Sequence, residues 1–512
     1  MALLWKSYVL LAGLLSISQL VSAQVNDQEA TLLAINMELK VPGWGADVAN
    51  YCNWTGIRCD SNHSMVEMLD LSRFGLSGNV SLISELKALR WLDLSNNNFH
   101  GPIPPALGNL SQLEFLDLSM NKFGGLVPRE LGSLRNLKSL NVSDNSLEGE
   151  MPGELEGLAK LESLQVSSNR LNGSIPSWVG NMTNLEVFTA YENYLSGEIP
   201  RNLGSNSELR LLNLHSNQLE GLIPGSIFSK GKLESLVLTQ NKLSGDIPAS
   251  VGNCRYLSSL RIGNNYLVGV IPNEIGNVES LAYFEADNNH LSGEISSAFG
   301  QCANLTLLNL ASNGFSGRIP PDFGQLVNLQ ELILAGNNLF GDIPKTILGC
   351  RSLNKLDLSN NRLNGTIPAN ICNMSKLQYL ILDHNSIRGD IPHEIGNCVK
   401  LLALQMGSNY LTGSIPPEIG RIRNLQIALN LSFNHLHGPL PPELGKLDKL
   451  VSLDVSNNQL SGVIPPQFRG MLSLIEVNFS NNLLKGAIPT SVPFQKSPNS
   501  SFFGNKGLCG DP

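Results

Sequence analysis

The chain has 512 residues, of which only 15% are charged, and its formal net charge at pH 7 is −8. Ordinary soluble domains carry about 25% charged residues. No basic run or stripe occurs anywhere, which excludes the usual electrostatic footprint of a nucleic-acid-binding protein. The length and the 48 glycines, with abundant Leu and Asn, favour several domains or a repeat array over one core.

The first 23 residues have the pattern of a secretory signal peptide. Lys6 precedes an apolar run over residues 8–15, and small residues occupy the cleavage positions at 21–23. A transmembrane anchor is the alternative, but the run is shorter than the roughly 20 apolar residues that a spanning helix needs. Asn-x-Ser/Thr sequons point to the same secretory route and are candidate glycosylation sites. They are Asn53, Asn62, Asn79, Asn109, Asn141, Asn172, Asn181, Asn304, Asn364, Asn373, Asn430, Asn478 and Asn499.

The rest of the chain repeats with a period of 24 residues. The segment "LRWLDLSNNNFHGPIPPALGNL" (89–110) aligns with "LEFLDLSMNKFGGLVPRELGSL" (113–134), and the prolines of the G-x-I-P element recur in phase from 104 to 416. Ser296 replaces one of these prolines, and one extra residue shifts the last three to 441, 465 and 489. Counting the strand cores gives eighteen repeats between residues 65 and 489.

Each L-x-L element predicts a short strand with both leucines on one side. One such strand cannot bury its apolar face alone, so neighbouring repeats must stack into a solenoid. The Asn at 97, 121, 145 and so on to 482 can satisfy backbone groups where the chain turns, so these residues should form a buried ladder. Glycine before each proline permits the turn. Phe74 replaces the ladder Asn in the first repeat, as suits an end repeat.

The pattern L-x-x-L-x-L-x-x-N-x-L-x-G-x-I-P resembles the plant-type leucine-rich repeat, and the resemblance covers residues 26–512. The order "EATLLAIN" (29–36), "YCNWTGIRCD" (51–60), repeats and "FFGNKGLCGDP" (502–512) resembles ectodomains of plant leucine-rich repeat receptor-like kinases. It is most similar to the peptide-hormone receptor group that includes the receptor for tracheary element differentiation inhibitory factor and its correlated relatives.

The resemblance implies an α/β leucine-rich repeat solenoid, a right-handed superhelical arc with a parallel β-sheet on its concave face. Seventeen steps of about 4.8 Å would give a sheet of roughly 80 Å. The expected parts are a signal peptide (1–23), an N-terminal disulfide cap (24–64), eighteen repeats (65–489) and an incomplete C-terminal cap (490–512). The implied function is extracellular: the chain binds a peptide or other ligand, pairs with a shorter leucine-rich repeat co-receptor kinase, and lies on the outer side of the plasma membrane.

Eight cysteines divide by position. Cys52 and Cys59 flank a turn just before the first strand, where a disulfide would staple a cap over the apolar end. The cysteines at 254, 302, 350 and 398 are spaced by two repeats, about 10 Å, which exceeds the roughly 7 Å limit for a disulfide. We therefore expect buried thiols at these four positions. Cys372 lies between two of them, out of phase, so a bridge to Cys350 or to Cys398 is also conceivable.

Cys509 has no partner of its own class. In the family that the chain resembles, a second cysteine follows and closes the C-terminal cap, and a transmembrane helix and a cytoplasmic kinase domain come after it. A natural short form with a free Cys509 is the alternative. Membrane attachment is thus expected only through a segment outside this chain.

No catalytic constellation occurs in the sequence: there is no Walker loop and no H-R-D or D-F-G set. His393-Glu394 begins a zincin-like string, but Asn397 stands where the second His belongs. We therefore expect that the 512 residues present do not form an enzyme and that they bind no metal or cofactor.

Binding is expected at strand residues that point away from the core. Most repeats carry Asp, Ser and Asn there, as do Asp93 and Ser95, which we interpret as solvated filler. The middle repeats depart from that pattern, and exposed apolar groups on such a surface favour a ligand track over drift on an unused face. The candidate ligand-binding residues are Tyr191, Glu192, His215, Val237, Gln240, Arg261, Tyr283, Glu285, Asp287, Ile333, Tyr379, Ile381, Asp383, His384 and Gln405.

An extended peptide would gain anchors from Tyr191 and Tyr283, and Arg261 would meet an acidic group. In the receptor group that the chain resembles, two arginines flanking one strand hydrophobe bind the free carboxylate of the peptide. No repeat here has both: Arg261 faces Ser259, and Arg421-Ile422-Arg423 precedes its strand. A modified peptide, a glycan or a partner ectodomain is therefore also conceivable as ligand. Two other functions are conceivable: a soluble inhibitor of a hydrolase, or a receptor-like protein without a kinase. Inhibitors of that kind look like shorter repeat arrays with both caps closed, so the repeat number and Cys509 argue against the first.

Overall fold

The computed structural model describes residues 27–45 and 50–510. The expected signal peptide lies outside these residues. The chain divides into two compact units, Met1–Pro200 with Asn206–Glu208, and Arg201–Ser205 with Leu209–Pro512. We call them the first and the second unit.

The first unit begins with a cap built from α2 (Asp27–Leu39), η1 (Tyr51–Asn53) and β1 (Ile57–Cys59). The strand β1 pairs antiparallel with β2 (Val66–Asp70), the first strand of the repeats. A disulfide joins Cys52 to Cys59. The buried rings of Trp44 and Trp54 lie 5.4 Å apart beneath it. The cap therefore covers apolar surface that the first repeat would otherwise expose to water.

Each repeat contributes one strand to a parallel sheet, and the face that this sheet presents to solvent is here called the inner face. The first unit adds to β2 the strands β3 (Trp91–Asp93), β5 (Phe115–Asp117), β7 (Ser139–Asn141), β9 (Ser163–Gln165) and β11 (Val187–Thr189). The second unit has β13 (Leu211–Asn213), β15 (Ser235–Val237), β17 (Ser259–Arg261), β19 (Tyr283–Glu285), β21 (Leu307–Asn309), β23 (Glu331–Ile333), β25 (Lys355–Asp357), β27 (Tyr379–Ile381), β29 (Ala403–Gln405), β31 (Ala428–Asn430), β33 (Ser452–Asp454) and β35 (Glu476–Asn478).

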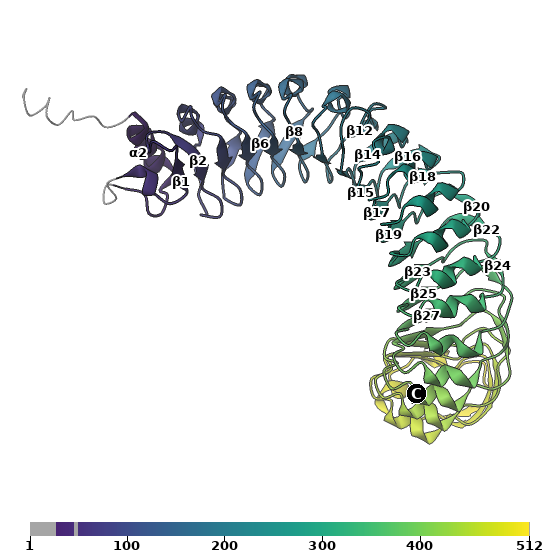
Figure 1. The fold of residues 1–512 in the computed structure, drawn as a ribbon. Helices are drawn as coiled ribbons and strands as arrows, with labels where there is room; N and C mark the ends of the chain where they lie inside the picture. The colour runs from purple at the N-terminus through teal and green to yellow at the C-terminus, as the bar shows by residue number, and fades with distance from the viewer. Residues whose placement is uncertain (1–26, 46–49, 511–512) are drawn as a thin grey trace, which may run out of the picture. The chain divides into compact units, whose positions relative to one another are not determined.

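Short strands and 3-10 helices form the opposite side of each coil (Figure 1). In the first unit the strands are β4 (His100–Pro102), β6 (Lys122–Leu126), β8 (Ser146–Gly149), β10 (Arg170–Leu171) and β12 (Ser196–Glu198), and the helices are η2 (Ser81–Glu85), η3 (Pro105–Asn109), η4 (Arg129–Ser133), η5 (Gly153–Gly157) and η6 (Ser177–Asn181). In the second unit the strands are β14 (Gln218–Leu222), β16 (Lys242–Gly245), β18 (Tyr266–Leu267), β20 (Ser292–Glu294), β22 (Gly314–Ser316), β24 (Phe340–Gly341), β26 (Arg362–Leu363), β28 (Arg388–Asp390), β30 (Tyr410–Thr412), β32 (His437–Pro439), β34 (Gln459–Gly462) and β36 (Leu483–Ala487). Its helices are η7 (Gly225–Phe228), η8 (Ala249–Asn253), η9 (Asn273–Asn277), η10 (Ser297–Gln301), η11 (Pro321–Gln325), η12 (Lys345–Gly349), η13 (Ala369–Asn373), η14 (His393–Asn397), η15 (Pro417–Arg421), η16 (Pro442–Lys446) and η17 (Pro466–Gly470).

The second unit ends in α3 (Val492–Gln495), η18 (Asn499–Ser501) and β37 (Gly507–Cys509), which pairs parallel with β36. Phe494 and Phe502 pack on Phe479 of the last repeat, with ring centroids 5.9 and 6.0 Å away. Cys509 is exposed and unbridged. Among residues 27–45 and 50–510, no helix has both the length and the apolar character needed to span a bilayer.

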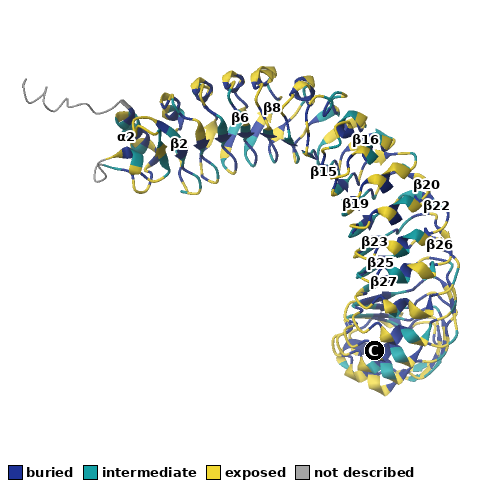
Figure 2. Cartoon of the chain, viewed as in Figure 1, coloured by how far each residue is buried: buried dark blue, intermediate teal, exposed yellow. Residues whose placement is uncertain are grey.

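The predicted leucine-rich repeat solenoid with a parallel sheet is confirmed within each unit. The residues at both leucine positions of every L-x-L element are buried, and most of the buried residues are apolar. Buried residues run through all the coils (Figure 2). The predicted asparagine ladder is confirmed as well: Asn265 donates through Nδ2 to the carbonyls of Leu238 (3.0 Å) and Ile262 (3.2 Å), and its Oδ1 accepts from Leu243 N–H (2.9 Å). Asn505 continues the ladder beyond the last repeat, since its Nδ2 lies 2.9 Å from Phe479 O.

The glycine before the proline has the backbone that the turn requires. Gly149 has φ +77°, and a Cβ there would lie 2.4 Å from Leu126 Cδ2 of the preceding repeat. A side chain at this position would therefore strain the backbone, and Leu126 would have to move to make room for it.

The expectation that Cys398 is a buried free thiol is wrong. Cys398 forms a disulfide with Cys372, with 4.8 Å between the Cα atoms. Cysteines on adjacent repeats can lie close enough for a disulfide, whereas cysteines two repeats apart are too far from each other. Cys254, Cys302 and Cys350 are free and buried, and burial raises the pKa of Cys302 and of Cys350 to about 11.

Candidate functional site

The inner face of the second unit presents a grid of side chains to solvent. In each strand the middle residue points into the core and its two neighbours point outward, because side chains alternate along a strand. Parallel pairing without slips aligns these outward positions into rows across the sheet. Tyr283 is 43% exposed, although the residues on either side of it in the chain, Ala282 and Phe284, are half-buried and buried. Most outward neighbours are half-buried, which leaves this face accessible to a ligand.

Arg261, Tyr283 and Glu285 form one cluster on β17 and β19. The guanidinium Cζ of Arg261 lies 5.3 Å from the centroid of the Tyr283 ring, and its Nε lies 3.5 Å from Glu285 Oε1. The strand register places Arg261 directly opposite Glu285. Among the described residues the Nη atoms of Arg261 have no hydrogen-bond or ion-pair partner. The guanidinium is therefore oriented by its neighbours while its outer donors are open to an acidic group.

Glu285 and Asp287 give this cluster an acidic side. Burial raises the pKa of Glu285, Arg261 lowers it, and the charges of Asp287 and Glu331 raise it again. Asp287 accepts hydrogen bonds through Oδ2 from Asn288 (2.7 Å) and Asn264 (3.3 Å). A ligand that meets Arg261 with an anion would thus also encounter fixed negative charge beside it, which favours a zwitterionic segment such as a peptide.

A second set of candidates lies on β23 to β29. Ile333 and Ile381 flank Asp357 in register, and Gln405 follows Ile381 on the next strand. Tyr379 stands beside Lys355 in the neighbouring row. These apolar side chains are half-buried and not exposed. The cluster is therefore an apolar strip with one carboxylate within it.

Asp383 does not point outward as expected. It is only 7% exposed, and its Oδ1 accepts hydrogen bonds from Gly407 N–H (2.5 Å) and Asn430 Nδ2 (3.1 Å). A Cβ at Gly407 would lie 2.7 Å from Asn430 Nδ2, so glycine is what permits this approach. Burial, offset in part by the Gly407 hydrogen bond and reinforced by Asp357, raises the pKa of Asp383 to about 6. Asp383 is therefore a structural carboxylate beneath the inner face.

Three candidates lie in the turn that follows a strand. Glu192, Gln240 and His384 are exposed and have φ of 52°, 58° and 54°. His215 and Gln240 are linked through Ser216 Oγ, which lies 2.9 Å from His215 Nδ1 and donates to Gln240 Oε1 (2.5 Å). These side chains line the edge of the inner face.

Tyr191 and Glu192 belong to the first unit, and the other candidates belong to the second. Tyr191 is half-buried, and Ser168 Oγ donates to Glu192 Oε2 at 2.9 Å. Burial raises the pKa of Tyr191, and the charges of Asp144 and Glu192 reinforce this effect. Both residues therefore belong to the surface of β9 and β11.

The two-arginine arrangement is absent from the described strands. Ser259 occupies the position across Leu260 from Arg261. Arg421 and Arg423 flank the buried Ile422 at the end of η15, on the connecting side, where Arg423 Nη1 donates to Lys446 O at 2.8 Å. The Arg-Ile-Arg string is therefore an outer-surface feature, as the sequence predicts.

Three sequons lie on strands of the inner face, and the others lie in loops or 3-10 helices. Asn141, Asn430 and Asn478 lie on β7, β31 and β35 and are half-buried, and the other ten sequon asparagines are exposed. The Nδ2 of Asn478 donates to Asp454 Oδ2 at 3.3 Å. A glycan on one of these three strand asparagines would cover part of the inner face, so their modification bears directly on ligand access.

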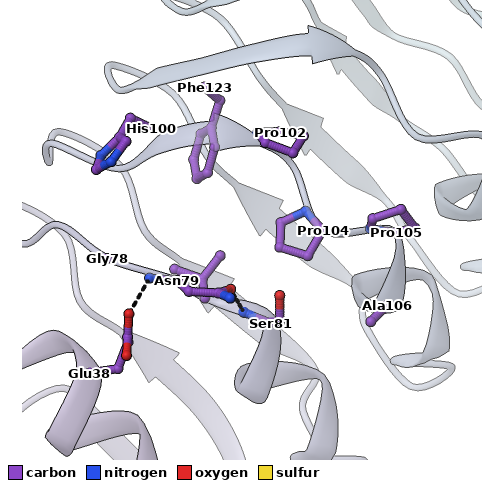
Figure 3. Close-up of a pocket in the computed structure, with 11 residues that line it drawn as sticks. Glu38, Gly78, Asn79, Ser81, His100, Pro102, Pro104, Pro105, Ala106 and Phe123 are labelled. Atoms are coloured by element: carbon purple, nitrogen blue, oxygen red, sulfur yellow. Dashed lines mark hydrogen bonds between the residues drawn. The ribbon is translucent and has the colours of Figure 1, made fainter.

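A pocket of about 500 Å³ lies on the first unit, away from the candidate residues (Figure 3). Pro102, Pro104 and Pro105 contribute to its wall. Glu38 accepts a hydrogen bond from Asn79 N–H at 3.2 Å, and Ser81 N–H donates to Asn79 Oδ1 at 2.8 Å. These polar groups are occupied in joining the cap helix to the first repeat, and we assign the pocket a structural role.

Sequence reasoning missed an aromatic pair on the inner face of the first unit. Trp91 on β3 and Phe115 on β5 stack with centroids 3.6 Å apart and planes 8° from parallel. Both residues directly precede an "LDLS" segment of the common pattern. The aromatic residue just before that segment is what departs from the other repeats. The signal was an aromatic residue at the first outward position of consecutive repeats.

Comparisons with known proteins agree with the repeat fold. Residues 70–221 match the family "Leucine-rich repeat region" and residues 327–387 match "Leucine rich repeat". Single repeats match at 232–254, 304–326, 427–447 and 449–471. Over 105 residues, 20% of the chain, the sequence is 69% identical to the leucine-rich repeat receptor-like tyrosine-protein kinase PXC3 of Arabidopsis thaliana, and the match spans 12% of that protein's length.

Solved structures align over most of the chain. The plant peptide hormone receptor RGFR1, in complex with RGF2, has a TM-score of 0.77 and 33% identity over 86% of this chain and 77% of its own. The ectodomain of the Arabidopsis receptor kinase HAESA, in complex with an IDA peptide hormone, has a TM-score of 0.62 and 30% identity over 94% and 97%. The similarity thus extends through nearly the whole of a receptor ectodomain. The chain belongs to the family of plant leucine-rich repeat receptor-like kinase ectodomains.

Proposed function

We propose that this chain is the ligand-binding ectodomain of a plant cell-surface receptor kinase and that it senses an extracellular peptide on the inner face of its second unit. The observation that carries the proposal is the Arg261, Tyr283 and Glu285 cluster, in which an oriented guanidinium with open donors stands beside an exposed aromatic ring. Tyr and Arg are the residue types that most often anchor protein interfaces.

Two groups of structural neighbours support a peptide as ligand. The GASSHO1/SCHENGEN3 ectodomain of Arabidopsis thaliana, 34% identical over 86% of this chain and 58% of its own, is in complex with CASPARIAN STRIP INTEGRITY FACTOR 2. The plant peptide hormone receptor RGFR1 is in complex with RGF2, and the HAESA ectodomain is in complex with an IDA peptide hormone. HAESA has also been seen with the co-receptor SERK1. By analogy this receptor would pair with a shorter leucine-rich repeat kinase and signal through its own kinase domain.

The experiment is a screen of the glycosylated chain, secreted from eukaryotic cells, against synthetic extracellular plant peptides, each prepared as free acid and as C-terminal amide. We expect a binder whose affinity falls when Arg261 is replaced by Gln. Because no strand offers two arginines, we expect the acid and the amide to bind within about threefold of each other. If the only binders are insensitive to Arg261, the ligand does not use this cluster. If none of the peptides binds, a glycan or a partner ectodomain becomes the better ligand class.

A further inference from the structure

The first unit carries a second exposed surface, composed of two parallel rows on β2, β3 and β5. One row is Met68, Trp91 and Phe115, and the other is Asp70, Asp93 and Asp117. The strand register places the members of each row directly opposite one another, so neighbours within a row are about 4.8 Å apart and the rows are about 7 Å apart. We call this set the aromatic–acidic surface. The two rows alternate with buried leucines and therefore point to the same side of the sheet.

The aromatic row is held in place and remains accessible. Trp91 and Phe115 stack almost parallel, 3.6 Å between centroids, yet Trp91 is 38% exposed. Phe115 stacks on one face of the indole, and Met68 lies in register with Trp91 on its other side, so both neighbours restrict the ring while part of it stays in water. Trp44, Trp54 and Trp178 are buried. A large aromatic side chain kept rigid and in water on a sheet face is the usual anchor of an interface.

The acidic row is negative and lacks a basic partner. Each aspartate caps its own turn through Oδ1: Ser72, Ser95 and Ser119 donate their N–H groups at 3.0, 2.9 and 2.8 Å. Within the described residues none of the three forms an ion pair with Lys or Arg.

Asn141 closes the row at one end, where its Nδ2 lies 3.0 Å from Asp117 Oδ2. Burial raises the pKa of Asp93, hydrogen bonds from Ser95 lower it, and the neighbouring charges of Asp117 and Asp70 raise it. The mutual repulsion of these carboxylates would be relieved by a cation.

Two of the nearby basic residues, Arg90 and Lys138, are engaged with Glu114. A third, the exposed Arg58 of β1, lies in register with Met68 at the end of the aromatic row and forms no ion pair with the three aspartates among the described residues. Arg90 donates through Nε to Glu114 Oε1 at 2.8 Å, and Lys138 Nζ lies 2.8 Å from Glu114 Oε2. Hydrogen bonds from Lys138 and then Arg90 hold the pKa of Glu114 below its usual value. The three groups form a satisfied network on the flank of the aromatic row, so Arg90 and Lys138 are not paired with the aspartates.

The surface is local to these three strands. On β7, β9 and β11 the corresponding outward residues are neutral: Ser139 with Asn141, Ser163 with Gln165, and Val187 with Thr189. The second unit has two aspartates at the same position. Asp357 lies between Ile333 and Ile381, with Lys355 at the aromatic position, and Asp454 lies between Asn430 and Asn478, with Ser452 at that position. The aspartates belong to the common LDLS pattern, so it is the aromatic row beside three consecutive aspartates that sets this surface apart.

We propose that the aromatic–acidic surface binds an arginine-bearing segment of a partner polypeptide. A guanidinium group stacks on an aromatic ring and forms paired hydrogen bonds to carboxylates, and a separation of about 7 Å lets one side chain do both. The aliphatic stem of the arginine would cover Met68 or Phe115. This proposal does not rest on the ligand cluster of the second unit.

The test uses the full secreted chain and a fluorescein-labelled, C-amidated peptide Gly-Arg-Gly-Arg-Gly-Arg-Gly, with a second peptide in which citrulline replaces each arginine. Fluorescence anisotropy at near-physiological salt measures both affinities. We expect the arginine peptide to bind at least about tenfold more tightly than the citrulline peptide, because citrulline keeps the shape and loses the charge.

Matched variants localise the binding. Asp93→Asn and Trp91→Ala should each weaken the arginine peptide by about fivefold or more. Asp454→Asn changes the net charge of the chain equally and should leave the affinity within about twofold. Arg261→Gln, which tests the cluster of the second unit, should also leave it unchanged.

Three results would overturn the proposal. They are equal binding of the two peptides, no measurable binding of the arginine peptide, and equal losses for Asp93→Asn and Asp454→Asn, which would indicate general attraction to an acidic protein. Circular dichroism confirms that Asp93→Asn, whose amide oxygen can still cap Ser95, is folded.

Discussion

Arg261 lies over the ring of Tyr283, with its Cζ 5.3 Å from the ring centroid. The two residues occupy neighbouring strands and different rows of the inner face, so the contact is diagonal across the sheet. Such a contact orients the guanidinium without consuming its outer donors. The consequences of this and three other arrangements can be measured.

Replacing Arg261 by Gln should weaken the peptide found in the library screen by about tenfold or more, because a charge-assisted hydrogen bond contributes roughly 1.5–3 kcal/mol. Tyr283→Ala should act in the same direction, since it removes the ring that orients the guanidinium. Calorimetry measures both. Arg388→Gln on the outer strand β28 is the control and should bind normally; an equal loss there would mean that only net charge matters.

Replacing Asp383 by Asn should stabilise the protein at neutral pH. In the unfolded chain this carboxyl releases its proton near pH 3.9, whereas the folded carboxyl, with a pKa of about 6, keeps it longer. The folded state therefore binds more protons, and stability falls as pH rises from about 4 to about 6, by on the order of 2–3 kcal/mol.

The side-chain amide oxygen of the Asp383→Asn variant can still accept a hydrogen bond from Gly407 N–H. The loss of stability between about pH 4 and about pH 6 should therefore be absent from the variant. Thermal melts at pH 4 and pH 7.5 test it: the variant should match the wild type at pH 4 and melt higher at pH 7.5. Asp287→Asn, at the same repeat position but half-buried, serves as the comparison. A variant that melts lower at pH 7.5 would show that the charge is used in the fold.

Alkylation of the denatured, unreduced chain should label four of its eight cysteines, and reduction should expose all eight. The double variant Cys372→Ser with Cys398→Ser should lose about 2–4 kcal/mol of stability in its own region, because the bridge limits the unfolded chain. Mass spectrometry and urea unfolding give the two readouts. Cys350→Ala, which removes a buried free thiol, separates loss of the bridge from loss of packing. Six labels in the unreduced chain would contradict the second disulfide.

Asn265→Ala should destabilise the repeats around it by about 2–4 kcal/mol, because three carbonyls and one N–H lose a buried partner at once. Hydrogen exchange should rise first in the segments that contain Leu238 and Leu243. Replacing the exposed Asn253 by Ala should change neither the stability nor the hydrogen exchange of these segments. Equal exchange in both variants would mean that water or a shifted backbone satisfies the ladder.

Much of the fold follows from the sequence because the 24-residue period assigns each residue a fixed place in the coil. The leucines, the ladder asparagines and the turn glycines all perform the roles that their spacing predicts. The cysteines show where this reasoning stops. Spacing excludes bridges across two repeats, but whether Cys372 reaches Cys350 or Cys398 depends on how two adjacent 3-10 segments pack.

The candidate site follows from the sequence only in part. The outward positions of β15 to β29 were identified, since strand alternation is local. Asp383 was placed outward on the same reasoning, yet it is buried, because Gly407 and Asn430 of later repeats approach and hold its carboxylate.

By itself the sequence determined the repeat, the solenoid, the cap disulfide and the set of outward positions, since each depends on spacing along the chain. Only the tertiary structure decided which outward side chains meet. Trp91 with Phe115, Asp93 with its two neighbours, and Arg261 with Tyr283 are contacts between repeats. Their chemistry depends on the register of strands that are about 24 residues apart, and no single repeat contains it.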